Sequence, residues 1–440
     1  MLRLLRVLLR SVVHARLSGV VGFVVLFFVS PYSGTVERKK AKATILAMNS
    51  QRFRGDLDFL SESGYRILIL RWPFQTAIAK LFWPYDLGQS YCEMVLFEDS
   101  AWEIRKKKTR TLIRQFVPWL SRFHKVDCIV GAALHYRFDV DWGGAFEEAG
   151  IPYIVLHREN MSVASEKRRR EKIKTWGGYV PFEGSLLAVH SKVMAETLVE
   201  SGYIDDKRVK ALGSIRHDRL PRLITENKGK IPEGKPLVTL FSFTFSPDLG
   251  LCKHFEYGCH PSFEELFMSV HGRIAEMAIS EPGVDFLVKS KWSGVWREAF
   301  YKALSDRGIC YDDVPNLTFS DEGDVNDIIL NSLCVIALNS TTALESAVLG
   351  RPVIRPYYSD AGESASDYML FIGEDDGFVY AESEGDLEWH VKSMIACAEL
   401  WEEVRTEKSR GMFERYVSPL DGCCLSRYSE CIEDVALDRH

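Results

Sequence analysis

The feature that most constrains the fold is a regular alternation of short apolar runs with amphipathic segments. In the first half of the chain the apolar runs lie at 42–50, 65–72, 126–133, 151–157 and 184–191. In the second half they lie at 236–243, 284–291, 316–321, 333–340 and 351–357. Short buried strands that alternate with helices are typical of parallel sheets. The sequence therefore predicts an α/β chain with two doubly wound, Rossmann-type domains.

The stretch 215–235 breaks this alternation, because it is polar and rich in proline and glycine. Such composition is typical of a linker between domains. Two doubly wound domains would place a ligand in a central cleft, opposite the carboxyl ends of the strands. We therefore expect an N-terminal domain over 43–218, a linker over 219–235, a C-terminal domain over 236–390 and C-terminal helices over 391–440.

Residues 1–42 form a basic and apolar segment of a different kind. Four arginines stand among leucines and valines in 1–16, and the run Leu17–Val29 is continuously apolar. Thirteen helical residues span about 20 Å, less than the roughly 30 Å of a hydrocarbon core. A secretory signal, a signal anchor, and a basic helix with a shallow apolar hairpin in the inner leaflet remain open. Basic residues at 38–42 favour the last, so we expect a membrane-associating segment, peripheral or single-anchor, on the cytoplasmic face.

Composition narrows the classes of partner and site. Lys and Arg number 55 against 61 Asp and Glu, a net charge of −6. A mildly acidic chain is unsuited to a nucleic-acid backbone, so no nucleic-acid partner is expected. None of the ten cysteines stands in a Cys-x-x-Cys pair. We therefore expect no metal site, and the scattered thiols favour a reducing compartment.

The most informative stretch is 324–356, where an apolar run ends at Asn339-Ser340 and a helix opens at Thr341-Thr342. The first N–H groups of a helix lack intrahelical acceptors, and its dipole favours an anion there. Glu345 lies about one turn further on and can accept from sugar hydroxyls. The alternative is that Ser340 is only a helix cap and Glu345 its capping-box partner.

The segment NSTTALESAVLGRPVI resembles the C-terminal domain of GT-B-fold glycosyltransferases, above all capsule and surface-carbohydrate biosynthesis proteins. It is more loosely similar to CDP-glycerol glycerophosphotransferases and UDP-N-acetylglucosamine 2-epimerases. In those proteins the run binds the phosphates and sugar of a nucleotide donor. The strand ending VKSKW resembles their Lys-x-Lys segment. The resemblance implies donor-binding roles for Asn339, Ser340, Thr341, Thr342, Glu345, Lys289 and Lys291.

Further likeness lies at 190–218 and 418–432, so the resemblance covers about 190–432, and residues 43–190 only in architecture. The chain also departs from the pattern. Surface-carbohydrate proteins usually carry a basic residue and proline where this chain has Lys291-Trp292. The acidic-Ser-Gly-Gly pattern of the epimerases and the Asp-Tyr-Ser-Ser pattern of the glycerophosphotransferases are both absent.

Polar residues after the N-terminal apolar runs are candidates for acceptor chemistry. Asn49 and Ser50 follow the first run, while HYRFDVDW at 135–142 and LHREN at 156–160 follow two later ones. An inverting transferase needs one base beside the acceptor hydroxyl. We expect Glu159 or Asp139 to be this catalytic base. His135 and His157 are acceptor-side candidates, or else ordinary structural histidines.

Together these observations predict a membrane-associated, metal-independent GT-B glycosyltransferase. It would move a sugar from a nucleotide-sugar donor to a surface-polysaccharide or lipid-linked acceptor, with no cofactor besides the donor substrate. A nucleotide-sugar epimerase, a polyol-phosphate transferase, and a non-catalytic GT-B-like subunit that binds glycan are the alternatives.

Overall fold

The computed structural model describes residues 18–53, 55–82, 100–134, 140–158, 163–178, 181–245, 262–291, 293–362, 369–371, 377–396 and 404–437. The chain forms two compact units. Unit 1 comprises residues 1–163, 169–218 and 421–440, and unit 2 comprises residues 164–168 and 219–420. Each unit has its own sheet and its own hydrophobic core.

The sheet of unit 1 has the strand order β1-β3-β2-β4-β5-β6-β7. All neighbours pair in parallel except β1, which is antiparallel to β3. The strands are β1 (Val29–Pro31), β2 (Thr44–Met48), β3 (Arg66–Leu70), β4 (Cys128–Gly131), β5 (Tyr153–Leu156), β6 (Leu186–Val189) and β7 (Val209–Ala211).

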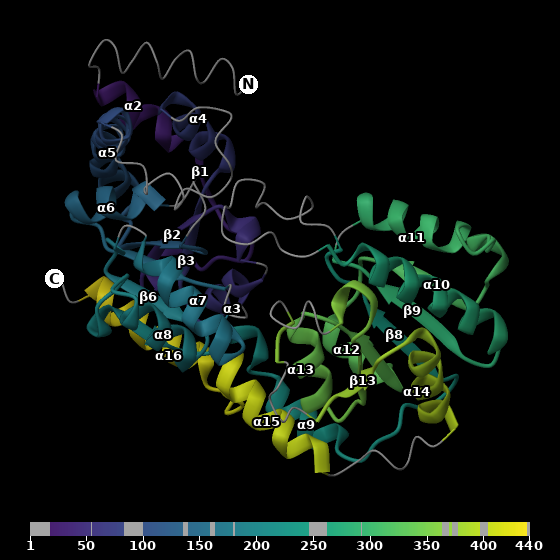
Figure 1. Cartoon of the computed structure of the whole chain (residues 1–440). Coiled ribbons are helices and arrows are strands. Elements are labelled where there is room, and N and C mark those ends of the chain that lie inside the picture. The colour runs from purple at the N-terminus through teal and green to yellow at the C-terminus, as the bar shows by residue number, and fades with distance from the viewer. Residues whose placement is uncertain are drawn as a thin grey trace. The chain divides into compact units, whose positions relative to one another are not determined.

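Helices cover both faces of this sheet (Figure 1). Successive residues of β2 serve opposite cores: Leu46 and Met48 pack toward α5, whereas Ile45 and Ala47 pack toward α3 and α16. A strand buried on both faces must be apolar throughout, which explains its continuous apolar run. The helices are α2 (Ser18–Leu26), α3 (Asp56–Glu62), α4 (Trp72–Phe82), α5 (Ser100–Trp119), α6 (Val140–Glu148), α7 (Glu166–Gly177), α8 (Lys192–Glu200) and α16 (Cys424–Leu437).

Unit 2 has an all-parallel sheet in the order β10-β9-β8-β11-β12-β13. Its strands are β8 (Leu237–Phe241), β9 (Asp285–Lys289), β10 (Leu317–Ser320), β11 (Cys334–Ala337), β12 (Val353–Pro356) and β13 (Val379–Ala381). Its helices are α9 (Leu220–Asn227), α10 (Glu264–Ser280), α11 (Val295–Ser305), α12 (Val325–Asn331), α13 (Thr341–Val348), α14 (Glu384–Ala396) and α15 (Val404–Tyr416). Helix α10 packs against α11 and α14, and α13 packs against α12 and α15.

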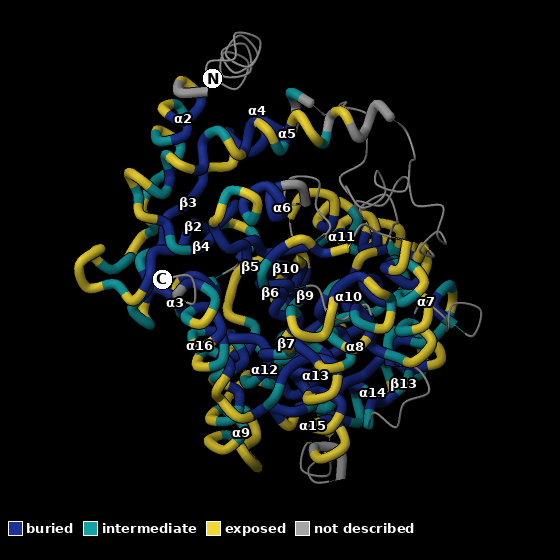
Figure 2. Tube along the Cα trace, turned by 90° about the vertical axis from the view of Figure 1, so that its left-hand side faces the viewer, coloured by how far each residue is buried: buried dark blue, intermediate teal, exposed yellow. Residues whose placement is uncertain are grey.

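Burial along the trace follows the apolar runs of the sequence, so the strands of both units lie inside (Figure 2). The prediction of an α/β chain with two doubly wound, mainly parallel sheets is confirmed. Because helices cover the faces of each sheet, the apolar strands are buried without the sheet closing into a barrel.

Three expected limits differ from the structure. Helix α9 occupies Leu220–Asn227, inside the stretch expected to be a linker. The expected C-terminal helices divide between the units, α15 with unit 2 and α16 with unit 1. Residues 18–31 of the expected N-terminal tail are built into unit 1, because α2 packs on α5 and β1 pairs with β3. No helix within the described ranges is long and apolar enough to cross a membrane.

Helix α16 is attached to unit 1 at its first turn by Asp218. The two carboxylate oxygens of Asp218 accept hydrogen bonds from the backbone N–H groups of Cys424 and Leu425, each at 2.8 Å. A carboxylate at this position satisfies orphan donors and complements the helix dipole. Tyr428, one turn on, donates its hydroxyl to the carbonyl of Gly213 at 3.0 Å.

His271 is a buried histidine in the core of unit 2. Its Nδ1 lies 2.7 Å from the carbonyl oxygen of Phe267, and its Nε2 lies 3.0 Å from the hydroxyl of Ser242, just beyond β8. Burial lowers the pKa of His271 to about 3. The folded protein therefore holds this ring neutral at pH values where the unfolded chain would protonate it.

This shift predicts a specific loss of stability in acid. Below the ordinary histidine pKa the unfolded chain gains a proton that folded His271 does not, so the free energy of unfolding falls as the pH falls. The contribution between about pH 7 and about pH 5 is about 2 kcal/mol. We expect His271→Gln, which keeps polar atoms but does not titrate, to lose less stability over this range in urea unfolding. An identical acid loss in wild type and variant would contradict the assignment.

Candidate functional site

The strand order of unit 2 changes direction between β8 and β11. From β8 the chain proceeds to β9 and β10 on one side, and then crosses to β11, β12 and β13 on the other. At such a switch point the loops leaving the two central strands diverge, which opens a crevice at their carboxyl ends. Asn339 to Thr342 follow β11 directly, so the sequence motif lies at this point of the fold.

Ser340 caps the N-terminus of α13. Its hydroxyl oxygen accepts from the backbone N–H of Thr342 at 3.3 Å and from the hydroxyl of Thr342 at 2.8 Å. Because the oxygen of Ser340 accepts in both contacts, its own hydrogen can donate to a further acceptor. The side chains of Ser340, Thr341 and Thr342 are only partly buried. The helix thus presents hydroxyl and amide groups at its positive end.

The alternative role that we considered for Ser340, a helix cap, is present. The capping box between Ser340 and Glu345 is not. A capping box would need a Glu or Gln side chain at the third helical position, which is Ala343 rather than Glu345. The backbone N–H of Ser340 donates to the carbonyl of Leu338 at 2.9 Å. Glu345 lies on the second turn of α13 and is buried. Asn339 accepts from the backbone N–H of Leu370 at 2.9 Å, which ties the end of β11 to the segment that follows β12.

The two lysines at the end of β9 occupy different environments. The ammonium of Lys289 is buried and donates to the carbonyls of Ser290 and Asp321, at 3.1 and 2.9 Å. Burial lowers its pKa, and the nearby charge of Asp321 opposes that shift. Two of its three donors are thus used, and the bond to Asp321 joins the end of β9 to the end of β10. Lys291 is exposed.

In unit 1 the corresponding change of direction lies between β2 and β4, because β3 and β4 flank β2. Asn49 and Ser50 follow β2 there, and Asn49 is buried in the left-handed region with φ of 51°. His157 follows β5 and is fully buried. The predicted base candidates Glu159 and Asp139, and the acceptor-side candidate His135, lie outside the described residues.

From a basic group at the carboxyl ends of β5, β6 and β7, sequence reasoning named His157 as a site candidate but missed His190, Arg216 and His217. The backbone N–H of Gly213 donates to the carbonyl of His190 at 3.1 Å, and that of His157 donates to the carbonyl of Ala188 at 2.8 Å. Burial is the largest cause that lowers the pKa of His190 well below its ordinary value. The neighbouring positive groups that add to this shift are, in decreasing order, Arg216, His217, Arg158 and His157.

A carboxylate among the described residues lies beside this group: Asp56 Oδ2 is 3.2 Å from Nε of Arg158. Charges gathered at one sheet edge and shifted pKa values are typical of functional sites, although structural ion pairs also produce them. The sequence signal that could have found this group is the position of its residues. Each of His157, His190 and the Arg216-His217 pair follows an apolar run, as residues at the carboxyl edge of a parallel sheet do.

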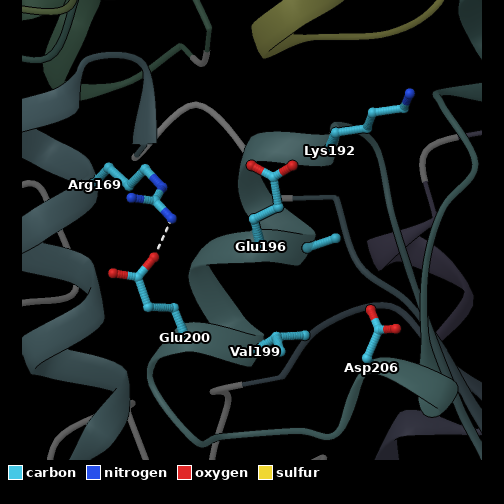
Figure 3. Close-up of a pocket in the computed structure, with 7 residues that line it drawn as sticks. Arg169, Lys192, Glu196, Val199, Glu200 and Asp206 are labelled. Carbon is cyan, nitrogen blue, oxygen red and sulfur yellow. Dashed lines mark hydrogen bonds and ion pairs between the residues drawn. The ribbon is translucent and has the colours of Figure 1, made fainter.

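A separate shallow hollow of about 390 Å³ lies beside α8 in unit 1 (Figure 3). Its polar lining has both signs of charge, and Arg169 pairs with Glu200 across it. None of the predicted site residues lines it. The polar lining residues are Arg169, Lys192, Glu196, Glu200 and Asp206. Across the described part of the chain, no group of three or more His, Cys, Asp or Glu side chains could hold a metal ion.

No protein-family model matches the chain, and no curated protein matches it either. Solved structures are similar to it over most of its length. A UDP-GlcNAc 2-epimerase from Neisseria meningitidis bound to UDP-GlcNAc has a TM-score of 0.45 and 12% identity, over 88% of this chain and 99% of that one. A MnaA-UDP co-structure from S. aureus has a TM-score of 0.48 and 13% identity, over 89% of this chain and 96% of that one.

The wall teichoic acid polymerase TagF with CDPG is also similar, with a TM-score of 0.49 and 12% identity, over 92% of this chain and 91% of that one. At these identities and TM-scores the likeness carries no argument about activity, which has to be argued from the site.

Proposed function

We propose that the chain is a glycosyltransferase that binds a nucleotide-sugar donor at the carboxyl edge of the unit 2 sheet and transfers its sugar to a glycan or lipid-linked acceptor. The observation that carries the proposal is the hydroxyl-capped N-terminus of α13 at the switch point between β8 and β11. The segment 339–354 also resembles the runs that bind the nucleotide donor in GT-B-fold glycosyltransferases. This resemblance supports the proposal independently of the comparisons of whole structures.

The chemistry of this helix end suits a nucleoside diphosphate. The positive end of α13 and the hydroxyls of Ser340, Thr341 and Thr342 would face the diphosphate, whose negative charge increases as the sugar leaves. Exposed Lys291 would add a cation beside the diphosphate. Lys289, held by two carbonyls, would instead position the loops after β9 and β10.

The transfer step needs one proton acceptor and a stabilised leaving group. A carboxylate or histidine would take the proton of the acceptor hydroxyl while that oxygen attacks the anomeric carbon, and the bond from that carbon to the diphosphate breaks. Glu159 and Asp139 remain our candidates for this base. Stabilisation of the diphosphate by a helix end and a lysine, rather than by a metal, keeps the proposed reaction metal-independent.

The proposal predicts that nucleotide binding depends on the α13 cap. In a thermal-shift screen of the full chain against UDP, CDP, GDP and dTDP and their sugars, one nucleotide should clearly raise the melting temperature. In the variant with Ser340→Ala and Thr342→Val, affinity for that nucleotide should fall roughly tenfold or more, because charge-assisted hydrogen bonds to the diphosphate are lost.

The control for this variant is Thr318→Val, which removes an exposed hydroxyl from β10 in the same unit. It should leave nucleotide affinity unchanged. Equal affinity of wild type and the double variant, measured by calorimetry, would rule out the α13 cap as the donor site.

A second prediction separates transfer from epimerisation. The test uses the nucleotide sugar that raises the melting temperature most. Release of nucleoside diphosphate from it should depend on an added glycan or lipid-linked acceptor. The sugar recovered from incubation without acceptor should keep its configuration in NMR spectra. Inversion at the C2 carbon of the sugar without any acceptor would contradict transferase activity and identify an epimerase.

A further inference from the structure

Helix α2 has one face that is part of the fold of unit 1. Val21 and Val25 are fully buried and belong to the core that α5 lines. Gly22 lies against Trp119 at the end of α5, so closely that a Cβ atom on Gly22 would stand 2.0 Å from a ring carbon of Trp119. Three residues after α2, β1 pairs with β3. The helix is thus fixed to the domain and is not a detachable tail.

The opposite face of α2 is apolar and exposed. Val20 and Phe23 on this face are 39% and 54% exposed, and Phe27, in the turn directly after α2, is 65% exposed; we call these three residues the α2 ridge. The rings of Phe23 and Phe27 lie 5.0 Å apart, edge to face. Helix α2 packs on α5, and Figure 1 shows the two helices beside each other in unit 1. Adjacent exposed aromatic side chains are unfavourable in water and typical of a surface that meets an apolar partner.

Aromatic and basic side chains also lie on the segments that contact α2 and the residues after it. Phe123 is exposed and stacks on Trp119, the residue that contacts Gly22, and the guanidinium of Arg122 lies 5.8 Å from the ring of Phe123. On the β1 side, the N–H of Arg71 donates to the carbonyl of Phe28 at 2.8 Å, and exposed Trp72 follows it. Tryptophan, phenylalanine and arginine together are the composition of a membrane interface.

The charge of the adjoining sequence identifies the kind of partner. Residues 1–16 contain Arg3, Arg6, Arg10 and Arg16, and the first acidic residue of the chain is Glu37. A positive segment next to an apolar ridge matches an anionic lipid surface, whose phosphates attract arginine while its acyl chains accept phenylalanine.

We propose that the α2 ridge is a membrane-docking surface that inserts Val20, Phe23 and Phe27 into the headgroup region of an anionic leaflet. The helix lies along the membrane while its other face stays packed on α5. This inference does not depend on the proposed transferase activity. It specifies a peripheral mode of attachment for the N-terminal segment.

Vesicle sedimentation of the full chain tests the docking. Wild type should bind vesicles of equimolar phosphatidylcholine and phosphatidylglycerol, bind phosphatidylcholine alone more weakly, and lose binding as salt is raised. The variant with Phe23→Ser and Phe27→Ser should bind the anionic vesicles at least about tenfold more weakly, because two apolar side chains no longer leave water. Phe23→Leu with Phe27→Leu should keep most of the binding.

Trp389→Ser is the matched control, because Trp389 is an aromatic residue on α14 that is 62% exposed in unit 2. It should bind vesicles like wild type, and circular dichroism should show that every variant folds. Failure of wild type to bind anionic vesicles, or equal binding by the serine variant, would overturn the proposal. A dimer in lipid-free solution that the serine variant abolishes would also overturn it, since the ridge would then be covered by a second copy.

Discussion

Parallel strand pairing is the constraint on which the rest of this structure depends. In a parallel sheet every strand ends at the same edge, so residues far apart in the sequence are gathered there. In unit 2 this places Ser340 beyond β11 at the same sheet edge as Ser242 beyond the adjacent β8 and as the residues after β9. In unit 1 it brings His157 and His190 together at the ends of β5 and β6. Both candidate sites follow from the sheets.

The strength of the proposed donor site lies in groups that need no rearrangement. The Ser340 cap is already formed, and its two accepted hydrogen bonds leave the hydroxyl hydrogen available to an anion. Helix dipoles and fixed hydroxyls act on a leaving diphosphate without a reorganisation cost, which is the basis of electrostatic catalysis. The carboxyl edge of the unit 1 sheet has a different environment. There, burial and neighbouring groups such as Arg216 hold the pKa of His190 well below its ordinary value.

The fold was largely predictable from the sequence, since apolar runs bounded by polar residues mark buried parallel strands. The Ser340 cap was predictable for the same reason, because a strand end followed by Ser-Thr-Thr is local information. Lys289 shows the limit: its partners are carbonyls of the adjacent strand ends, and only the register of β9 and β10 brings Asp321 to it. The packing of α2 into unit 1 could not be predicted either. In the sequence, Gly22, which lies against Trp119, looks the same as a glycine in a flexible hairpin.

Hydrogen–deuterium exchange of the full chain, with and without a saturating nucleotide that binds it, tests the central claim most directly. The account predicts slower exchange of the backbone amides at 340–346, because a bound diphosphate accepts from the first turn of α13 and opposes its opening. Nucleotide binding that leaves exchange at 340–346 unchanged, and protects only the strand ends of unit 1, would contradict the placement of the donor.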